Sequence, residues 1–294
     1  MANNNPLVVA NPWLALRQLT AARIALGRAG ASLPTQPQLD FQLAHARARD
    51  AVQVGLDVPQ LLQALQATVP NAAGNCLQLA SAAEDRLTYL QRPDLGRRLS
   101  EASRAQLTAR AQVSDLTSPE GNAFDFDLAV VVADGLSARA VAQNVPPLLA
   151  ALWPLLATQS VSLAPLSVVT QARVAIGDEV GQLLRARLVV VLIGERPGLS
   201  SPDSLGAYLT WMPRVGLTDE SRNCVSNIRP AGLGAGAAAA QILALILAMR
   251  QRQLSGVLLK DESLHTAISR ALLVESGTGQ KTDEYFGKSG CSPR

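Results

Sequence analysis

Aromatic residues are rare in this chain. Phenylalanine, tryptophan and tyrosine together make up 3% of the 294 residues, whereas 48% are hydrophobic, so an aliphatic core is expected. A surface that stacks nucleic-acid bases needs aromatic side chains and is therefore not expected. The net charge of +3 is spread over residues of both signs without a basic block, which also argues against a nucleic-acid partner.

Cysteine and histidine are too few and too dispersed for most catalytic or metal sites. The cysteines are Cys76, Cys224 and Cys291, with no C-x-x-C pair, and the histidines are His45 and His265. This pattern indicates neither a disulfide framework nor a zinc site, and it fits the reducing cytoplasm. No carboxylate pair or Ser-His-Asp set occurs either, so we expect no catalytic or metal-binding residues. Such a chain is expected to bind a cofactor that carries the chemistry, or to complete a partner's site.

The chain also lacks the sequence features of export or membrane insertion. Its first residues, MANNNPLVV, do not have the charged-then-apolar layout of a signal peptide. The most apolar later stretch, residues 235–249, contains Gln241 and is too short to cross a bilayer, so it predicts a buried helix. We therefore expect a cytoplasmic protein without a membrane-spanning segment.

Two parts with different patterns follow each other along the chain. Residues 1–116 are expected to form a helical N-terminal domain, because apolar residues recur at helical spacing in 12–26 and 39–54 and strand-like alternation is absent. A turn-rich linker then leads into a second domain, 117–260. The last part, 261–294, becomes polar and rich in glycine and serine, and is expected to be a flexible tail.

The second domain alternates short aliphatic runs with helical patterns. Strands are predicted at 126–133, 162–169, 188–193, 207–211 and 224–228, and helices at 137–156, 178–185 and 236–253. Strands that alternate with helices favour a parallel sheet with helical cover. The sequence therefore predicts an α/β protein, in which a helical N-terminal domain is followed by a Rossmann-like, mostly parallel sheet domain.

The clearest predicted strand ends in a polar turn, GERPG at 194–198. Ligands of open α/β sheets bind beyond the carboxyl ends of the strands, where Glu195 can accept hydrogen bonds from ligand amides and Arg196 can pair with a carboxylate or phosphate. The alternative is a plain turn with a surface ion pair. The turn after the preceding clear strand, DGLS at 134–137, is expected on the same sheet edge, either as part of this site or as a simple helix N-cap.

Two further features allow competing interpretations. Cys224 is either a plain buried thiol or a site residue, and without a suitably placed histidine it is not expected to be a nucleophile. Residues 232–237 fit the dinucleotide fingerprint G-x-G-x-x-A before a helix, and a possible strand follows at 256–259. The corresponding alternative is a nucleotide-binding oxidoreductase that uses Gly232–Gly236, although Arg229-Pro230 interrupts the approach to the glycines.

Many ordered segments between Leu19 and Lys260 match one known family. They include LDFQLAHARARDAV at 39–52, RVAIGDEVG at 173–181 and the stretch 189–208. Together they resemble the small (light, β) subunit of ethanolamine ammonia-lyase, which uses adenosylcobalamin to convert ethanolamine into acetaldehyde and ammonia. The resemblance implies a helical N-terminal part, a Rossmann-like C-terminal part and a hetero-oligomer. In that hetero-oligomer the large (α) subunit holds the substrate site and the small subunit closes over the cobalamin.

The resemblance assigns the cobalamin contacts to Val174, Glu195 and Cys224. Val174 would offer an apolar or backbone contact, Glu195 would accept hydrogen bonds from corrin side-chain amides, and Cys224 would pack as a small soft group. A purely structural assembly subunit without ligand contact remains a further alternative. Some relatives carry a long N-terminal extension that helps packaging into an ethanolamine-utilisation bacterial microcompartment. Because the match here begins by residue 19, simple cytoplasmic residence and packaging both stay open.

Overall fold

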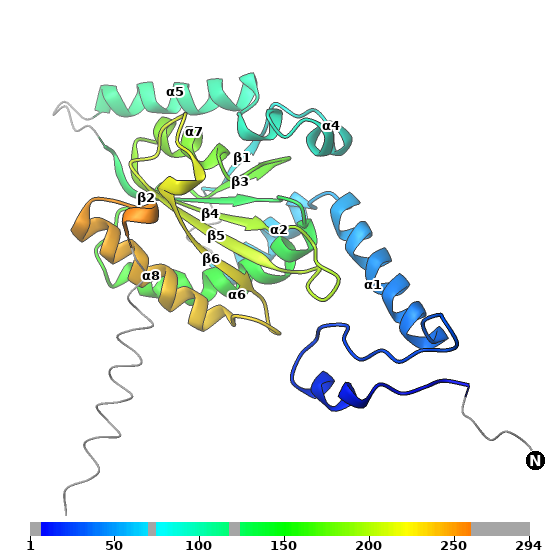
Figure 1. Cartoon of the computed structure of the whole chain (residues 1–294). Coiled ribbons are helices and arrows are strands. Elements are labelled where there is room, and N and C mark those ends of the chain that lie inside the picture. The colour runs from blue at the N-terminus through cyan, green and yellow to red at the C-terminus, as the bar shows by residue number, and fades with distance from the viewer. Residues whose placement is uncertain (1–6, 70–74, 118–123, 260–294) are drawn as a thin grey trace, which may run out of the picture. The chain divides into compact units, whose positions relative to one another are not determined.

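One six-stranded sheet forms the centre of the chain, in a computed structural model that describes residues 7–69, 75–117 and 124–259 (Figure 1). These residues belong to a compact unit that ends at Leu259, and the tail predicted at 261–294 lies outside them. The strands are β1 (Leu77–Ala80), β2 (Phe126–Ala133), β3 (Ser167–Thr170), β4 (Ala186–Gly194), β5 (Leu205–Trp211) and β6 (Arg222–Ile228). Their order across the sheet is β1-β3-β2-β4-β5-β6.

The sheet is mostly parallel. The neighbouring strands β1, β3, β2 and β4 pair in parallel, whereas β5 pairs antiparallel with both β4 and β6. Among the described strands, β5 is thus the one that runs against the others. This arrangement confirms the predicted α/β fold. The predicted strand at 126–133 coincides with β2, while the strand predicted at 162–169 is shortened to β3.

Helices cover both faces of the sheet, and alternate residues of the same strand pack into two separate cores. On one face Val130 and Val132 pack with α6 (Ala138–Ala157) and α8 (Ala235–Arg252), and on the other Ala129 and Val131 pack with α7 (Ile176–Leu183) (Figure 1). Strands buried on both faces read as continuous apolar runs, which explains the sequences of β2 and β4. Because α6 follows β2 and α7 follows β3, these two crossovers leave the sheet on opposite faces.

The core helices are apolar because the sheet buries them. By length and composition α6 could cross a membrane, but half of its apolar window is buried inside the fold, as is usual for a core helix. Ser137 caps it as predicted, since its side-chain oxygen accepts a hydrogen bond from the Ala140 amide at 3.2 Å. The buried helix predicted at 235–249 is confirmed as part of α8, which buries residues such as Ile242 and Met249.

The region before residue 117 is mainly helical, as predicted, but it also contributes a strand. Its helices are η1 (Pro12–Gln18), α1 (Thr35–Gln53), α2 (Val58–Thr68), α4 (Arg86–Gln91), η2 (Leu95–Arg97) and α5 (Glu101–Thr117). The prediction that no strand occurs here is wrong, because β1 pairs with β3 from Leu77↔Ser167 to Ala80↔Thr170. A four-residue strand is too short for its alternation to be recognised. The division into N-terminal and C-terminal domains stays a prediction.

Two local predictions are wrong at positions with unusual backbone angles. The helix expected over 12–26 is limited to the 3-10 helix η1, and the backbone has positive φ further on at Ala25 and Gly27. The strand expected at 256–259 is instead the 3-10 helix η4 (Gly256–Leu258). Gly256 has φ +74°, and a Cβ there would lie 1.9 Å from the carbonyl oxygen of Glu220, so this close approach requires glycine.

Candidate functional site

The carboxyl ends of β2, β3 and β4 meet at a pocket of about 390 Å³. Its lining residues are Tyr89, Gly135, Leu136, Arg173, Val174, Ile193, Gly194, Glu195, Arg196 and Tyr208. The turns 134–137 and 194–198 therefore lie on one sheet edge, as predicted, because β2 and β4 are neighbouring parallel strands. Open α/β sheets place their ligands at such an edge, where successive crossovers diverge to opposite faces.

Two glycines allow the ends of β2 and β4 to approach each other closely. Gly135 has φ +58°, and a Cβ there would lie 2.2 Å from the carbonyl oxygen of Gly194. A Cβ on Gly194 would in turn lie 2.1 Å from the carbonyl oxygen of Ser137. The Leu136 amide donates a hydrogen bond of 2.9 Å to the Gly194 carbonyl. Backbone contacts thus fix this wall of the pocket.

Asp134 lies behind this wall as a buried anchor. Its side chain is 1% exposed and pairs with Arg86 at 3.2 Å, and its other carboxylate oxygen accepts a hydrogen bond from the Ala172 amide at 2.9 Å. Arg86 also donates hydrogen bonds to the carbonyls of Gly135 and Val52. Burial raises the pKa of Asp134, while the Ala172 amide and the Arg86 charge act against that rise. The polar side chains of the 134–137 turn therefore serve the fold, as its simpler interpretation proposed.

Tyr89 and Arg173 form the wall on the β3 side, a role that was not predicted. Tyr89 is fully buried and donates a hydrogen bond to the Ala172 carbonyl at 3.1 Å, and burial raises its pKa to about 12. The Arg173 guanidinium stacks over the Tyr89 ring, 4.5 Å from its centroid. The buried Nε of Arg173 has no hydrogen-bond partner among the described residues, so an unsatisfied donor lies beside the pocket. The one available signal was the position of Arg173 directly before Val174.

Glu195 joins three chain segments at the rim of the pocket. Its carboxylate accepts hydrogen bonds from the hydroxyl of Ser204, from the hydroxyl of Ser226 at 2.8 Å and from the backbone amide of Asn227 at 3.3 Å. The end of β4 is thereby tied to the residue before β5 and to β6. A carboxylate offers about four lone-pair positions, so acceptor capacity remains for a ligand. Glu195 is therefore neither a free surface carboxylate nor the ion-pair partner of Arg196 that the alternative interpretation proposed.

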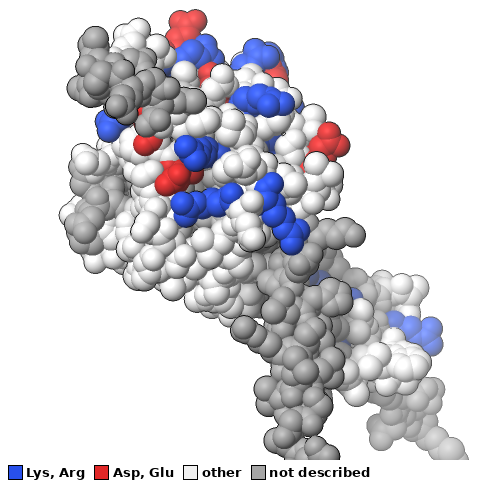
Figure 2. Space-filling model, turned by 90° about the vertical axis from the view of Figure 1, so that its left-hand side faces the viewer, with Lys and Arg blue, Asp and Glu red and all other residues white. Residues whose placement is uncertain are grey.

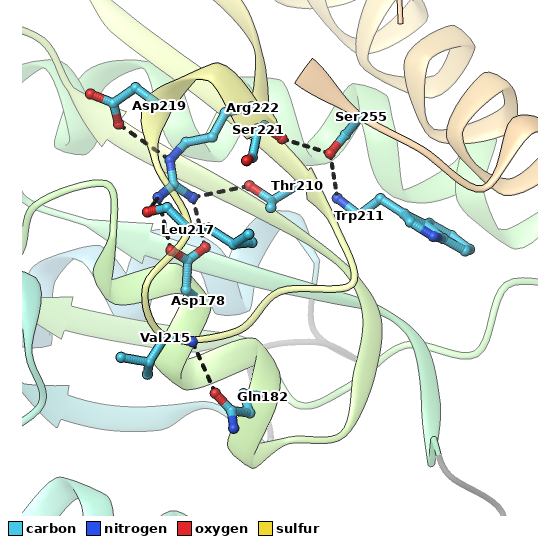
Figure 3. Close-up of polar contacts among 10 residues, drawn as sticks. All are labelled: Asp178, Gln182, Thr210, Trp211, Val215, Leu217, Asp219, Ser221, Arg222 and Ser255. Carbon is cyan, nitrogen blue, oxygen red and sulfur yellow. Dashed lines mark hydrogen bonds and ion pairs between the residues drawn. The ribbon is translucent and has the colours of Figure 1, made fainter. Parts of the chain in front are cut away.

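Val174 lies at the same pocket, half-buried on the turn between β3 and α7. A buried ion pair fixes the helix that follows, because Arg222 of β6 donates to both carboxylate oxygens of Asp178 at 2.6 and 2.8 Å (Figure 3). Arg222 also donates to the Thr210 hydroxyl of β5 at 3.2 Å. Burial raises the pKa of Asp178, and the pairing with Arg222 opposes that rise. The pair links the helix after Val174 to the edge strand of the sheet.

The loop before β6 packs around this ion pair. Figure 3 shows Asp219, in the 3-10 helix η3 (Asp219–Ser221), on the outer side of the guanidinium, at 3.4 Å from its Nε. The amide of Val215 in the same loop donates to the Gln182 side chain of α7 at 3.0 Å. These contacts attach the loop to α7, so several segments stabilise the helix that starts beside the pocket.

Cys224 and Tyr208 face each other on β6 and β5. Tyr208 lines the pocket, whereas Cys224 is an exposed residue beside it. Even so, desolvation raises the pKa of the Cys224 thiol, a hydrogen bond with Tyr208 lowers it, and the charge of Glu195 raises it further. Desolvation also raises the pKa of Tyr208, with Cys224 and Glu195 adding to the rise. Both shifts favour the protonated, neutral forms of the Cys224 thiol and the Tyr208 hydroxyl at pH 7.

The pocket offers hydrogen bonds and apolar contact, and the described residues contain no group of His, Cys, Asp or Glu that could hold a metal. His45, the one histidine within the described ranges, stacks on Phe41 of its own helix α1. On the face drawn in Figure 2, basic and acidic side chains are interspersed instead of forming one basic surface. Of the residues assigned from the resemblance, the structure brings Val174 and Glu195 together and places Cys224 next to them.

The glycine-rich segment 232–237 lacks the surroundings of a dinucleotide site. β6 lies at the edge of the sheet, and the helix α8 leads to η4 instead of a strand, so the described chain forms no β-α-β unit here. A Cβ on Gly232 would lie 2.5 Å from the Asn227 carbonyl oxygen, so this glycine serves a close turn. The structural context that the fingerprint requires is therefore missing.

Comparisons with known proteins all indicate one family. The model of the ethanolamine ammonia-lyase light chain (EutC) family matches residues 10–260. The ethanolamine ammonia-lyase small subunit of Pseudomonas paraeruginosa is 56% identical over 253 residues, or 86% of this chain and 88% of that protein. The small subunit of Pseudomonas putida is 54% identical over 279 residues, or 95% of this chain and 96% of that protein. The small subunit of Ralstonia nicotianae is 56% identical over 254 residues, or 86% and 90% of the two chains.

Proposed function

Because the chain belongs to the ethanolamine ammonia-lyase light chain family, we propose that it is the small subunit of an adenosylcobalamin-dependent ethanolamine ammonia-lyase. In this role it binds a large subunit that holds the substrate site, where ethanolamine is converted into acetaldehyde and ammonia. The pocket at the carboxyl ends of β2, β3 and β4 forms this chain's half of the cobalamin site.

The observation that carries the proposal is the meeting of Val174 and Glu195 at one pocket. Pockets of about 300–1,000 Å³ suit drug-sized ligands, and this one, at about 390 Å³, has room for only one edge of a corrin. The edge of a corrin carries amide side chains, which both donate and accept hydrogen bonds. Glu195 has spare acceptor capacity and the buried Nε of Arg173 lacks an acceptor, so the donor set suits such an edge.

Each assigned residue has a binding role. Glu195 accepts a hydrogen bond from a corrin amide, while Val174 and Cys224 contribute apolar contact and exclude water from the rim. The bound cofactor supplies radical chemistry through homolysis of its cobalt–carbon bond. In this proposal the chain binds and orients the cofactor, while the large subunit holds the substrate.

The test is to produce the large subunit with and without this chain and to assay ethanolamine deamination with added adenosylcobalamin. We expect activity only when both chains are present. A large subunit that reaches full activity alone would contradict a required role for this chain. As a second arm, Val174→Arg fills the pocket from a half-buried position, so we expect this variant to assemble with the large subunit but to lose activity.

A further inference from the structure

The N-terminal arm, residues 7–54, exposes most of the large apolar side chains found on the surface (blue in Figure 1). Of the 19 large hydrophobic residues that are exposed in the described chain, 13 lie in this arm. They include Leu7, Trp13 and Leu19, which are 92%, 66% and 83% exposed. So large an apolar surface in one segment marks an interaction site.

The arm forms two helices although few of their side chains are buried within the described chain. Its helix α1 has 19 residues and buries only Ala51, and its 3-10 helix η1 buries none. In proteins most of the stability of a helix comes from tertiary packing of one face and not from its intrinsic propensity. Hydrogen bonds between Val9 and Arg28 close the arm into a loop. Within the described chain α1 makes only a small contact with α6 and accepts a hydrogen bond from Arg86 at the Val52 carbonyl, so most of its surface is left for another molecule.

The arm continues the rim of the pocket. Arg23 donates a hydrogen bond to the Leu199 carbonyl at 3.2 Å and lies 3.5 Å from the Ser200 hydroxyl. Both residues belong to the loop that begins at Glu195 and connects β4 to β5. A molecule that covers the pocket therefore meets the arm along the same edge.

The charge of the arm argues against a second copy of this chain as the covering molecule. The arm contains five arginines and two aspartates, without lysine or glutamate. Two such arms facing each other would bring like charges together at low dielectric, which costs several kcal/mol in general. An apolar surface bordered by acidic residues is complementary to it.

We propose that the N-terminal arm docks on an apolar, acid-bordered surface of the large subunit and provides much of the affinity that holds the two chains together. This inference rests on the proposed function, because it takes the large subunit as the partner. The inference assigns a separate role to each region: the arm binds the partner chain, and the pocket binds the cofactor.

The test uses the complex of full-length chains without cobalamin, with the apparent Kd measured from its dissociation on dilution by mass photometry. The variant Trp13→Glu/Leu19→Glu places charges on the arm, and Val257→Glu/Leu258→Glu is the matched control at residues that are 72% and 75% exposed outside it. We expect the arm variant to raise the Kd at least tenfold and the control less than twofold. Both variants should keep the thermal unfolding midpoint of the wild-type chain, because none of the four side chains is buried.

The outcomes separate this inference from the proposed function. If the wild-type chain forms no complex with the large subunit, both fall. If the arm variant binds the large subunit as tightly as the wild-type chain does, the inference falls and the proposed function stands. If the arm variant loses only self-association, the arm contacts a second copy and the inference is again overturned.

Discussion

Helices α1 and α6 are nearly equal in length but differ in how they are stabilised. α6 has 20 residues and buries ten of them, and Ser137 caps its first turn. α1 has 19 residues and buries only Ala51, and Pro34 at its start offers no side-chain cap. Burial against the sheet supplies the stability of α6, since propensity alone is weak. α1 touches α6 only slightly and gains little of this stability within the described chain.

The same difference separates the sheet body, which comprises residues 58–69, 75–117 and 124–259, from the N-terminal arm. The body closes its core on both faces of the sheet and holds its polar groups in internal pairs such as Asp178–Arg222. The arm leaves its apolar side chains in solvent. In our account the body is complete by itself and positions the pocket, whereas the arm is completed by the large subunit.

The largest effect on the body is expected from breaking its buried ion pair. Asp178→Ala leaves the Arg222 guanidinium buried without its main partner, and such losses cost about 3–5 kcal/mol of unfolding free energy. Urea denaturation followed by circular dichroism measures it. The control is Asp219→Ala, since the Asp219 side chain is 97% exposed and should contribute little. Equal losses for the two variants would contradict the role given to the buried pair.

Truncating one leucine in the body and one in the arm compares how much each region contributes to the stability of the chain. Leu149 of α6 is 0% exposed and Leu19 of the arm is 83% exposed. Leu149→Ala should lower the free energy of unfolding by about 2–5 kcal/mol. Leu19→Ala should change it by less than about 0.5 kcal/mol in the isolated chain. A large loss at Leu19 would mean that the arm packs on its own chain, and the contrast between the regions would disappear.

The smallest predicted effect concerns the solvent accessibility of the Cys76 thiol, directly before β1. Burial raises the pKa of the Cys76 thiol to about 11. A raised thiol pKa means less thiolate at a given pH, so roughly one thiol in a thousand is ionised at pH 8. In a Cys224→Ser/Cys291→Ser variant, the rate of alkylation by iodoacetamide should therefore still rise with pH at pH 10. A rate that levels off above about pH 9.5, as expected for a thiol with the ordinary pKa of about 8.5, would show that Cys76 is solvated.

Long apolar strands and their order along the chain made much of the fold predictable. β2 was located to the residue because its last six residues, 128–133, form one apolar run that both cores bury. β1 was missed because four residues carry too little pattern. The 3-10 helix η4 was taken for a strand, because its apolar residues do not reveal the positive φ that Gly256 adopts.

The candidate site was predictable where it depended on strand direction and unpredictable where it depended on distant partners. The two polar turns were assigned to one edge because parallel strands end together. Arg86 and Asp134 are 48 residues apart, and Arg173 and Tyr89 are 84 apart, so no local pattern signals their contacts. The three hydrogen bonds that Glu195 accepts were likewise invisible, since they come from Ser204, Ser226 and Asn227.

The binding of adenosylcobalamin to the assembled two-chain complex tests the central claim most directly. Glu195→Ala should weaken it by about 0.5–3 kcal/mol, up to about a hundredfold in Kd. Glu195→Gln, which keeps an acceptor, should lose less, and Ser204→Ala, which removes one internal hydrogen bond but keeps the carboxylate, should lose least. An intact Glu195→Ala complex with unchanged affinity would contradict the claim and leave this chain as an assembly subunit alone.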